Sequence, residues 1–276
     1  MKLFILILIL LQIEFAQVKT GGERVINTFT QIYNGLSQSL ELYDIPIGAL
    51  YLSRHAINKS NFGDFITVSP TSFEVSFSKS VGENGHVSLG SMDKDILPHS
   101  IFLSRIGVNI LLDIFTQRKI TSTPYKNAFL FQKSLIYTYT LTELTKQLIK
   151  RERPDNSDDR SFFSGHTSTT FAAATYLYLE MNELYTGSDF FRQNIVLQKT
   201  AQVLTFSTLF GWAGYVGYSR IRDNKHYLSD VITGASIGIL VSYLVHKHYN
   251  VADEESGDLQ IYSSKQGLQL TFCMKF

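Results

Sequence analysis

The sequence predicts a mainly helical protein, built as a helical bundle with short strands in its N-terminal region and a β-hairpin at its C-terminus. Two observations favour this fold class. Several long stretches between residues 101 and 248 are apolar at helical spacing or almost throughout. Residues 268–276 instead alternate apolar and polar side chains, which is the period of a strand. With 276 residues, 44% hydrophobic and 18% charged, the chain is long enough to bury a substantial core.

Residues 1–16 have the features of an export signal peptide or an N-terminal anchor. Lys2 precedes the unbroken apolar run 3–11, and Ala16 is a small residue suited to a cleavage point. Glu14 stands where a second small residue is usual. The apolar run is well short of the ~20 residues of a spanning helix. We therefore expect an exported protein, periplasmic or secreted, with an uncleaved anchor as the alternative.

Region 17–99 is expected to hold one helix followed by irregular structure with short strands. Apolar residues recur at helical spacing over 23–42, which predicts an amphipathic helix that covers the domain. From 44 to 94 glycines interrupt the pattern, and residues 73–77 alternate as in a strand.

Region 100–250 is expected to form the helical core. Its helices are predicted at 101–117, 125–150, 167–179, 200–218 and 227–248. The uncharged stretch 200–219 is long enough to span a bilayer, whereas 231–245 is too short. Charges such as Asp113 and Lys133 favour a protein core over lipid. A soluble bundle is therefore preferred, with membrane association as the alternative.

Region 251–276 is expected to form an acidic linker and the hairpin. The acidic run 253–258 predicts a solvated connection, and residues 259–261 offer a partner strand for the alternating segment. The single cysteine, Cys273, excludes an internal disulfide. It leaves an inert side chain, a free thiol or an intermolecular link as the alternatives.

The stretch 219–230, S-R-I-R-D-N-K-H-Y-L-S-D, is the first of three groups that carry chemistry. On a helix His226 and Asp230 would share one face, about 6 Å apart. A carboxylate beside an imidazole fixes its tautomer and makes it a better base or nucleophile. Arg220 is suited to hold a phosphate or carboxylate beside the pair. Taken alone, this spacing is more typical of a solvated helix.

The second group is Lys146 and Arg153, which lie seven residues apart and are followed by Pro154. Seven residues make about two helical turns, so both cations could emerge on one side of a helix that Pro154 ends. They could then converge on one anion. A solvated basic helix end is the alternative.

The third group is Ser164-Gly165-His166, at the start of a predicted helix. Unpaired backbone N–H groups and a hydroxyl at a helix start make an anion site. Gly165 permits close approach of a ligand, and His166 could donate a proton to a leaving atom. An ordinary N-cap by Ser164 or Thr167 fits equally well.

Together, and in this order, K-x6-R-P, S-G-H and S-R-x5-H-x3-D resemble the three motifs of one superfamily. It comprises type 2 phosphatidic acid phosphatases, bacterial class A acid phosphatases and vanadium haloperoxidases. Phe163 stands where that family normally has proline, so φ is not fixed before Ser164. The resemblance covers about residues 100–247 and implies the helical bundle of that superfamily.

The resemblance also implies a role for each matched residue. His226 would be the nucleophile that forms a phosphohistidine, Asp230 would orient it, and His166 would protonate the leaving oxygen. The phosphate oxygens would be bound by Lys146, Arg153, Ser164, Gly165 and Arg220. Three permanent cations and a helix N-terminus supply the charge that a phosphoryl transition state needs without a metal.

The implied function is an exported, metal-independent phosphatase that acts on a phosphate monoester, either a lipid or isoprenoid phosphate or a soluble ester. No cofactor is expected, and vanadate should act as a phosphate mimic. The sequence has no H-E-x-x-H, cysteine pair or EF-type loop, and its net charge of +1 gives no support for nucleic acid binding. A vanadate-dependent haloperoxidase and a non-catalytic envelope or scaffold protein are the alternatives. The oligomeric state is not predicted.

Overall fold

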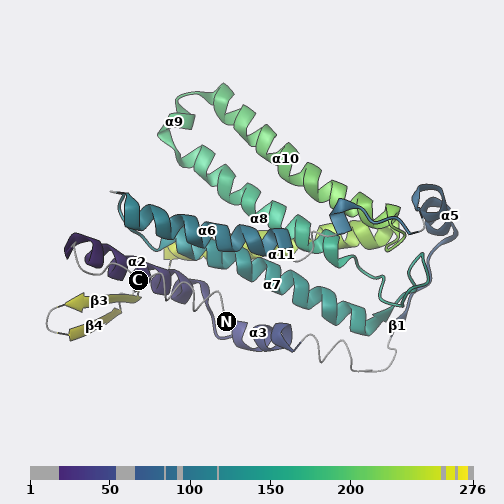
Figure 1. Ribbon diagram of the computed structural model, residues 1–276, viewed down its shortest axis with the longest axis horizontal. Coiled ribbons are helices and arrows are strands. Elements are labelled where there is room, and N and C mark those ends of the chain that lie inside the picture. The colour runs from purple at the N-terminus through teal and green to yellow at the C-terminus, as the bar shows by residue number, and fades with distance from the viewer. Residues whose placement is uncertain are drawn as a thin grey trace. The chain divides into compact units, whose positions relative to one another are not determined.

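The computed structural model describes most of the chain, and the expected signal segment 1–16 and Cys273 lie outside the described residues. The described residues are 19–53, 66–83, 85–91, 96–116, 118–255, 259–264 and 267–272. The fold is mainly helical, as predicted (Figure 1). The chain forms two compact units, Met1–Asp44 with His99–Gln132, and Ile45–Pro98 with Lys133–Phe276.

The first unit contains α2 (Lys19–Ser39), most of α6 (Ile96–Phe115) and the start of α7 (Thr123–Leu148). Its interior combines apolar side chains such as Leu130 and Phe131 with a buried polar cluster. The buried Asp113 carboxylate accepts hydrogen bonds from Arg118 Nε and Tyr125 Oη, each at 2.6 Å. Arg24 Nε donates to the Asp113 carbonyl at 2.8 Å. These contacts join α2, α6 and α7.

Helix α2 corresponds to the helix predicted at 23–42, but its apolar side chains point outward. A Cβ on Gly35 would lie 2.7 Å from the Tyr125 Cβ, so the small side of α2 faces α7. Ile26, Phe29 and Tyr33 are exposed. The apolar face of α2 therefore does not cover the first unit.

The N-terminal part of the second unit differs from the prediction. It contains α3 (Asp44–Leu52), α5 (Ser72–Val81), the 3-10 turn η1 (Leu89–Ser91) and the two-residue strand β1 (Ile66–Thr67), which pairs in parallel with β2 (Ile149–Lys150). The strand predicted at 73–77 was wrong, because these residues lie in α5. The helix begins with a capping box, in which Thr71 Oγ1 accepts from the Glu74 amide and the Glu74 carboxylate accepts from the Thr71 amide.

The second unit is completed by the end of α7 and four further helices. These are α8 (Gly165–Gly187), α9 (Asp189–Arg192), α10 (Ile195–Arg222) and α11 (Leu228–Glu255). Helix α8 packs against both α10 and α11 (Figure 1). The five helices predicted between 101 and 248 are confirmed, although α8, α10 and α11 extend further than expected.

Glycine allows α11 to contact the backbone of α8 directly. A Cβ on Gly238 would lie 2.2 Å from the Ser168 carbonyl oxygen, and a Cβ on Gly234 would lie 2.7 Å from that of Ser164. Both distances are shorter than any ordinary contact of a Cβ atom. The two helices are therefore closer than any larger residue at these positions would permit.

Two described helices are long and apolar enough to cross a membrane, over Leu97–Phe115 and Leu228–Tyr249. Neither is the stretch 200–219 that the sequence singled out. The judgement that 231–245 is too short was wrong, because α11 begins at Leu228 and continues to Glu255. Only 11% of the first stretch and 28% of the second are buried within the protein.

The C-terminal strands β3 (Leu259–Ser264) and β4 (Gly267–Phe272) pair antiparallel, with Leu259 opposite Phe272. The acidic run before them is not wholly a linker, because residues 253–255 form the last turn of α11.

Candidate active site

A cavity of about 330 Å³ in the second unit brings the three sequence motifs together. Of the eight predicted site residues, six line it: Lys146, Arg153, Gly165, His166, Arg220 and His226. The other two, Ser164 and Asp230, are fully buried and are not among the lining residues. Ser157, Asp158 and Lys225 complete the lining and were not predicted.

Lys146 and Arg153 reach the cavity from different structures. Lys146 lies in the last turn of α7, and its Nζ would be 3.7 Å from a Cβ placed on Gly165. The prediction that both cations share a helix face was wrong, because α7 ends at Leu148. Arg153 follows in a loop, where its Nε pairs with Asp158 at 2.6 Å and its Nη1 donates to the Lys225 carbonyl at 3.2 Å. The loop therefore connects the first motif to the third.

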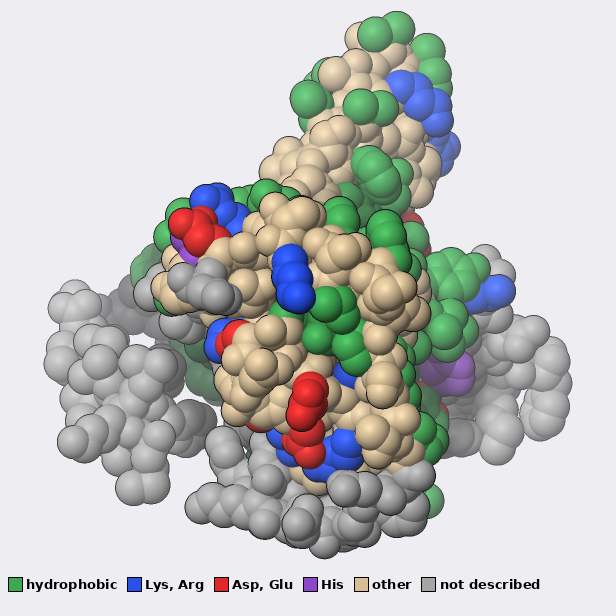
Figure 2. Space-filling view, turned by 90° about the vertical axis from the view of Figure 1, so that its right-hand side faces the viewer, with side chains coloured by type: hydrophobic (Ala, Val, Ile, Leu, Met, Phe, Trp, Pro, Cys, Tyr) green, Lys and Arg blue, Asp and Glu red, His purple; other side chains and the backbone are tan. Residues whose placement is uncertain are grey.

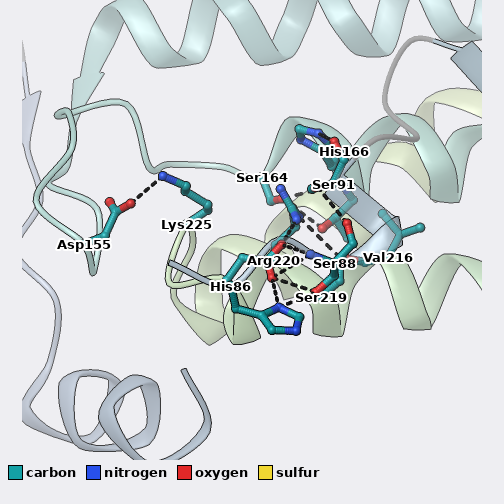
Figure 3. A network of polar contacts seen from close by, with 12 residues as sticks. His86, Ser88, Ser91, Asp155, Ser164, His166, Val216, Ser219, Arg220 and Lys225 are labelled. Atoms are coloured by element: carbon teal, nitrogen blue, oxygen red, sulfur yellow. Dashed lines mark hydrogen bonds and ion pairs between the residues drawn. The ribbon is translucent and has the colours of Figure 1, made fainter. Parts of the chain in front are cut away.

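Arg220 lies in the last turn of α10 and forms an ion pair with Asp223. The Asp223 carboxylate also lies 2.8 Å from His86 Nδ1 and accepts from Ser88 Oγ at 2.6 Å. Figure 3 shows His86 and Ser88 beside Arg220. Burial alone would raise the pKa of Asp223, but the hydrogen bonds from His86 and Ser88 and the charge of Arg220 lower it. Asp223 therefore stays ionised and holds the buried guanidinium in place.

His166 lies in the first turn of α8 and is anchored by η1. Its Nε2 is 3.0 Å from the carbonyl oxygen of Ser91 (Figure 3). Because a carbonyl only accepts, this nitrogen carries the hydrogen. The contact fixes the orientation of the imidazole at the edge of the cavity.

The expected shared helix face of His226 and Asp230 required both residues to be helical. His226 instead lies in the turn before α11, and only Asp230 lies in the first helical turn. His226 Nδ1 lies 3.7 Å from Asp230 Oδ2. The same oxygen accepts hydrogen bonds from Ser161 Oγ and the Tyr227 amide. Burial lowers the pKa of His226 to about 4, and the charges of Lys146 and Arg153 act in the same direction against the opposing effect of Asp230. The imidazole is therefore neutral near pH 7.

Ser164 is the N-cap of α8, which was the alternative reading of this motif. Its Oγ accepts from Thr167 Oγ1 at 2.9 Å, and its amide donates to the Asp230 carbonyl at 3.1 Å. The second and third motifs are thus joined through the backbone. The first backbone N–H groups of α8, at Gly165 and His166, mark the positive end of the helix.

The lining favours an anion. It contains four basic side chains, Lys146, Arg153, Arg220 and Lys225, and one acidic side chain, Asp158. Figure 2 views the end of the structure that carries α5 and shows basic and acidic side chains there in several small groups. No group of three or more His, Cys, Asp or Glu side chains that could hold a metal ion occurs among the described residues.

Sequence reasoning missed the partners that hold the site residues. Asp223 follows Arg220 by three residues at the end of a predicted helix, and this spacing could have revealed the pair. Arg151, which lies between the two predicted cations Lys146 and Arg153, was not predicted as a site residue, although it is buried and contacts Asp230. Glu74, which contacts Arg151 from 77 residues away, had no such indication.

Comparison with known proteins agrees with the motifs. The model of the PAP2 superfamily matches residues 128–253, which hold all eight predicted site residues. This stretch, a little under half of the chain, is similar to the PAP2 superfamily. The resemblance read from the three motifs is thereby confirmed.

Two relatives show how far the similarity extends. Lipid A 1-phosphatase of Porphyromonas gingivalis is 38% identical over 99 residues, 34% of this chain and 17% of that protein. Phospholipid phosphatase 2 of Rattus norvegicus is 37% identical over 87 residues, 30% of this chain and 28% of that protein. The matched segments span less than a third of either relative.

Among solved structures, a transmembrane PAP2 type phosphatidylglycerolphosphate phosphatase from Bacillus subtilis is similar with a TM-score of 0.40 and 14% identity. The similarity covers 83% of this chain and 96% of that one.

Proposed function

We propose that this PAP2 superfamily protein is a phosphatase that hydrolyses a lipid phosphate through a phosphohistidine at His226. The observation that carries the proposal is the cavity, which combines four basic side chains with two histidines. Permanent cations stabilise the charge of a phosphoryl group in its transition state. The curated relatives described above are named as lipid phosphatases.

The chemistry follows from the surroundings of the two histidines. Nδ1 of His226 faces Asp230, so Nε2 is the nitrogen that would attack phosphorus. The bond from phosphorus to the leaving oxygen breaks, and His166 supplies from Nδ1 the proton that this oxygen needs, because its Nε2 hydrogen is donated to Ser91. In the second half, His166 takes a proton from water, which attacks phosphorus and releases phosphate and neutral His226. Lys146, Arg153 and Arg220 hold the phosphate oxygens throughout.

A lipid substrate is supported by the outer surfaces of the helices that carry the site. Helix α11 exposes Ile232, Leu240 and Leu244, and α10 exposes Val203 and Leu204. Inside the same helix group lie many hydroxyl side chains, including Thr167, Ser168, Thr170, Thr175 and Ser242. Apolar side chains outside and hydroxyls at the helix contacts are typical of membrane helices. The preference for a soluble bundle is therefore replaced by the alternative of a membrane-associated one.

Export remains part of the proposal on sequence grounds alone, because it rests on residues 1–16. An exported membrane protein would meet lipid phosphates at the outer side of the membrane. No cofactor is proposed, and orthovanadate is expected to inhibit by occupying the phosphate site.

The test is phosphate release by the purified chain in detergent from phosphatidic acid, undecaprenyl pyrophosphate and p-nitrophenyl phosphate. We expect the lipids to be preferred, orthovanadate to inhibit, and His226→Ala to reduce kcat by about a thousandfold or more. His248→Ala, which changes an exposed histidine outside the cavity, is the matched control and should retain activity.

Three results would speak against the proposal. Equal turnover of the soluble ester would remove the lipid preference. Bromide oxidation by peroxide after vanadate loading, without any ester hydrolysis, would support the haloperoxidase alternative. A His226→Ala variant indistinguishable from wild type would support a non-catalytic role.

A further inference from the structure

Arg151 is a buried cation that the mechanism above does not use. Its side chain is 3% exposed, and its backbone is fixed on both sides by hydrogen bonds to Asp159 and Ser161. Its Nη1 donates to Ser229 Oγ at 2.8 Å and to Asp230 Oδ1. Burying a guanidinium is costly unless its hydrogens are matched by acceptors of opposite charge. Arg151 is therefore held by its partners in one orientation.

Glu74 supplies the second half of this arrangement. Both of its carboxylate oxygens accept from Arg151 Nη2 at 2.9 Å, and one also accepts from Ser229 Oγ. Burial would raise the pKa of Glu74, but hydrogen bonds from Ser229, Thr71 and Arg151 outweigh it and lower the pKa to about 2. Glu74 is therefore ionised throughout the working range of pH.

The pair determines how the Asp230 carboxylate is turned. Arg151 occupies Oδ1, while Ser161 and the Tyr227 amide donate to Oδ2, the oxygen that lies 3.7 Å from His226 Nδ1. A carboxylate held at both oxygens cannot rotate away from the imidazole. Arg151 thus fixes the side chain that in turn orients the proposed nucleophile.

The pair also determines how much negative charge Asp230 can offer. An arginine beside Asp230 with no other partner would compensate the charge that His226 needs when it becomes positive. Glu74 compensates Arg151 instead, so that the group of three side chains keeps a net charge of −1.

We propose that Glu74 and Arg151 are positioning residues of the reaction, which hold Asp230 in the orientation and charge state that support His226. The inference rests on the proposed function at His226. Glu74 lies in α5, outside residues 128–253 that match the superfamily model. The N-terminal region would then contribute directly to the rate of the chemical step.

The test compares Glu74→Gln with wild type for kcat, KM and the pH dependence of kcat/KM. We expect kcat to fall about 10-fold to 100-fold, with KM within about 2-fold because no phosphate-contacting group changes. The acid limb should move to lower pH, because uncompensated positive charge on Arg151 lowers the pKa of His226. The other charged groups facing His226, namely Asp230, Lys146 and Arg153, stay unchanged. Arg151→Lys keeps the positive charge but loses the several N–H donors of the guanidinium. It should lower kcat without moving the acid limb of the pH profile.

Arg160→Gln is the matched control. Arg160 pairs with Glu143 at 2.8 Å, in the same connection between α7 and α8, and does not line the cavity. It should change neither kcat nor the acid limb. An effect of Arg160→Gln equal to that of Glu74→Gln would overturn the inference, because loss of any ion pair in this connection would then suffice.

A thermal shift by orthovanadate shows whether each variant still folds its site. If Glu74→Gln does not fold, Ser229→Ala replaces it, since this removes only the hydroxyl that joins Arg151 to Glu74. Its kcat should fall about 3-fold to 10-fold, and an unchanged kcat would overturn the inference. Wild type without turnover, or His226→Ala equal to wild type, would instead refute the proposed function. A wild type that needs His226, with a folded Glu74→Gln that matches it in kcat and pH profile, would refute only the inference.

Discussion

The direct backbone contact between α8 and α11 leads to a sharp prediction for Gly234→Ala. The added Cβ would lie 2.7 Å from the Ser164 carbonyl oxygen, about 0.7 Å inside an ordinary contact of 3.4 Å. The obstacle is backbone rather than a flexible side chain, so the two helices must separate. Ser164 also donates its amide to the Asp230 carbonyl at 3.1 Å, and this bond must lengthen as they do.

The expected magnitudes follow from this overlap. Overpacking costs about 1–3 kcal/mol, and alanine returns about 0.5–1 kcal/mol of helix propensity. The midpoints of these ranges leave a fall of about 1 kcal/mol in the free energy of unfolding, or about 2–4 °C in Tm. A displacement approaching 1 Å between Gly165 and His226 should lower kcat by up to about 100-fold.

The assay combines thermal unfolding in detergent with phosphate release. Gly214→Ala is the matched control, because Gly214 lies within α10 and a Cβ there would meet no atom within 4 Å. This variant should be as stable as wild type or more so. If Gly234→Ala were as stable and as active as Gly214→Ala, the close contact would not limit the site and the reasoning would fail.

Three further predictions concern pH, metal and the first unit. The acid limb of kcat/KM should lie near pH 4, since the lowered pKa of His226 keeps the nucleophile neutral until the pH falls to about 4; a limb near pH 6.5 would contradict this environment. Turnover should persist in EDTA, because Lys146, Arg153 and Arg220 supply the positive charge, and loss of activity restored by Mg²⁺ would refute this. Asp113→Asn should lower the stability of the first unit by about 1–3 kcal/mol while the folded protein retains its kcat, and urea unfolding with parallel assays would test both.

The sequence predicted the helices well because each is a long apolar or periodic stretch with recognisable ends. It did not predict α5, because the alternation at residues 73–77 concealed a helix that the capping box of Thr71 and Glu74 starts. Nor did it predict which side of α2 is buried. Apolar periodicity identifies the apolar face of a helix. Whether that face packs against the rest of the protein is decided by tertiary contacts, such as that of Gly35 with Tyr125.

The candidate site was predicted residue by residue where the motifs are local, and less well where geometry depends on distant segments. Six of the eight residues line the cavity, whereas Ser164 and Asp230 are fully buried and do not line it. Spacing alone placed Arg153 on a helix, which in fact ends at Leu148. Contacts such as Glu74 with Arg151 join positions 77 residues apart, and no local pattern encodes them.

Residues 86–91 anchor His166 and Asp223, so they affect whether the proposed phosphatase site could be moved into another protein. Ser91 fixes the proposed proton donor, and His86 and Ser88 fix the carboxylate that holds Arg220. All three anchors lie upstream of the matched stretch 128–253. A chimera that transplants only this stretch would therefore carry every motif residue but lack the three anchors supplied by His86, Ser88 and Ser91. The proposed active site therefore depends on residues that lie outside the stretch that matches the superfamily model.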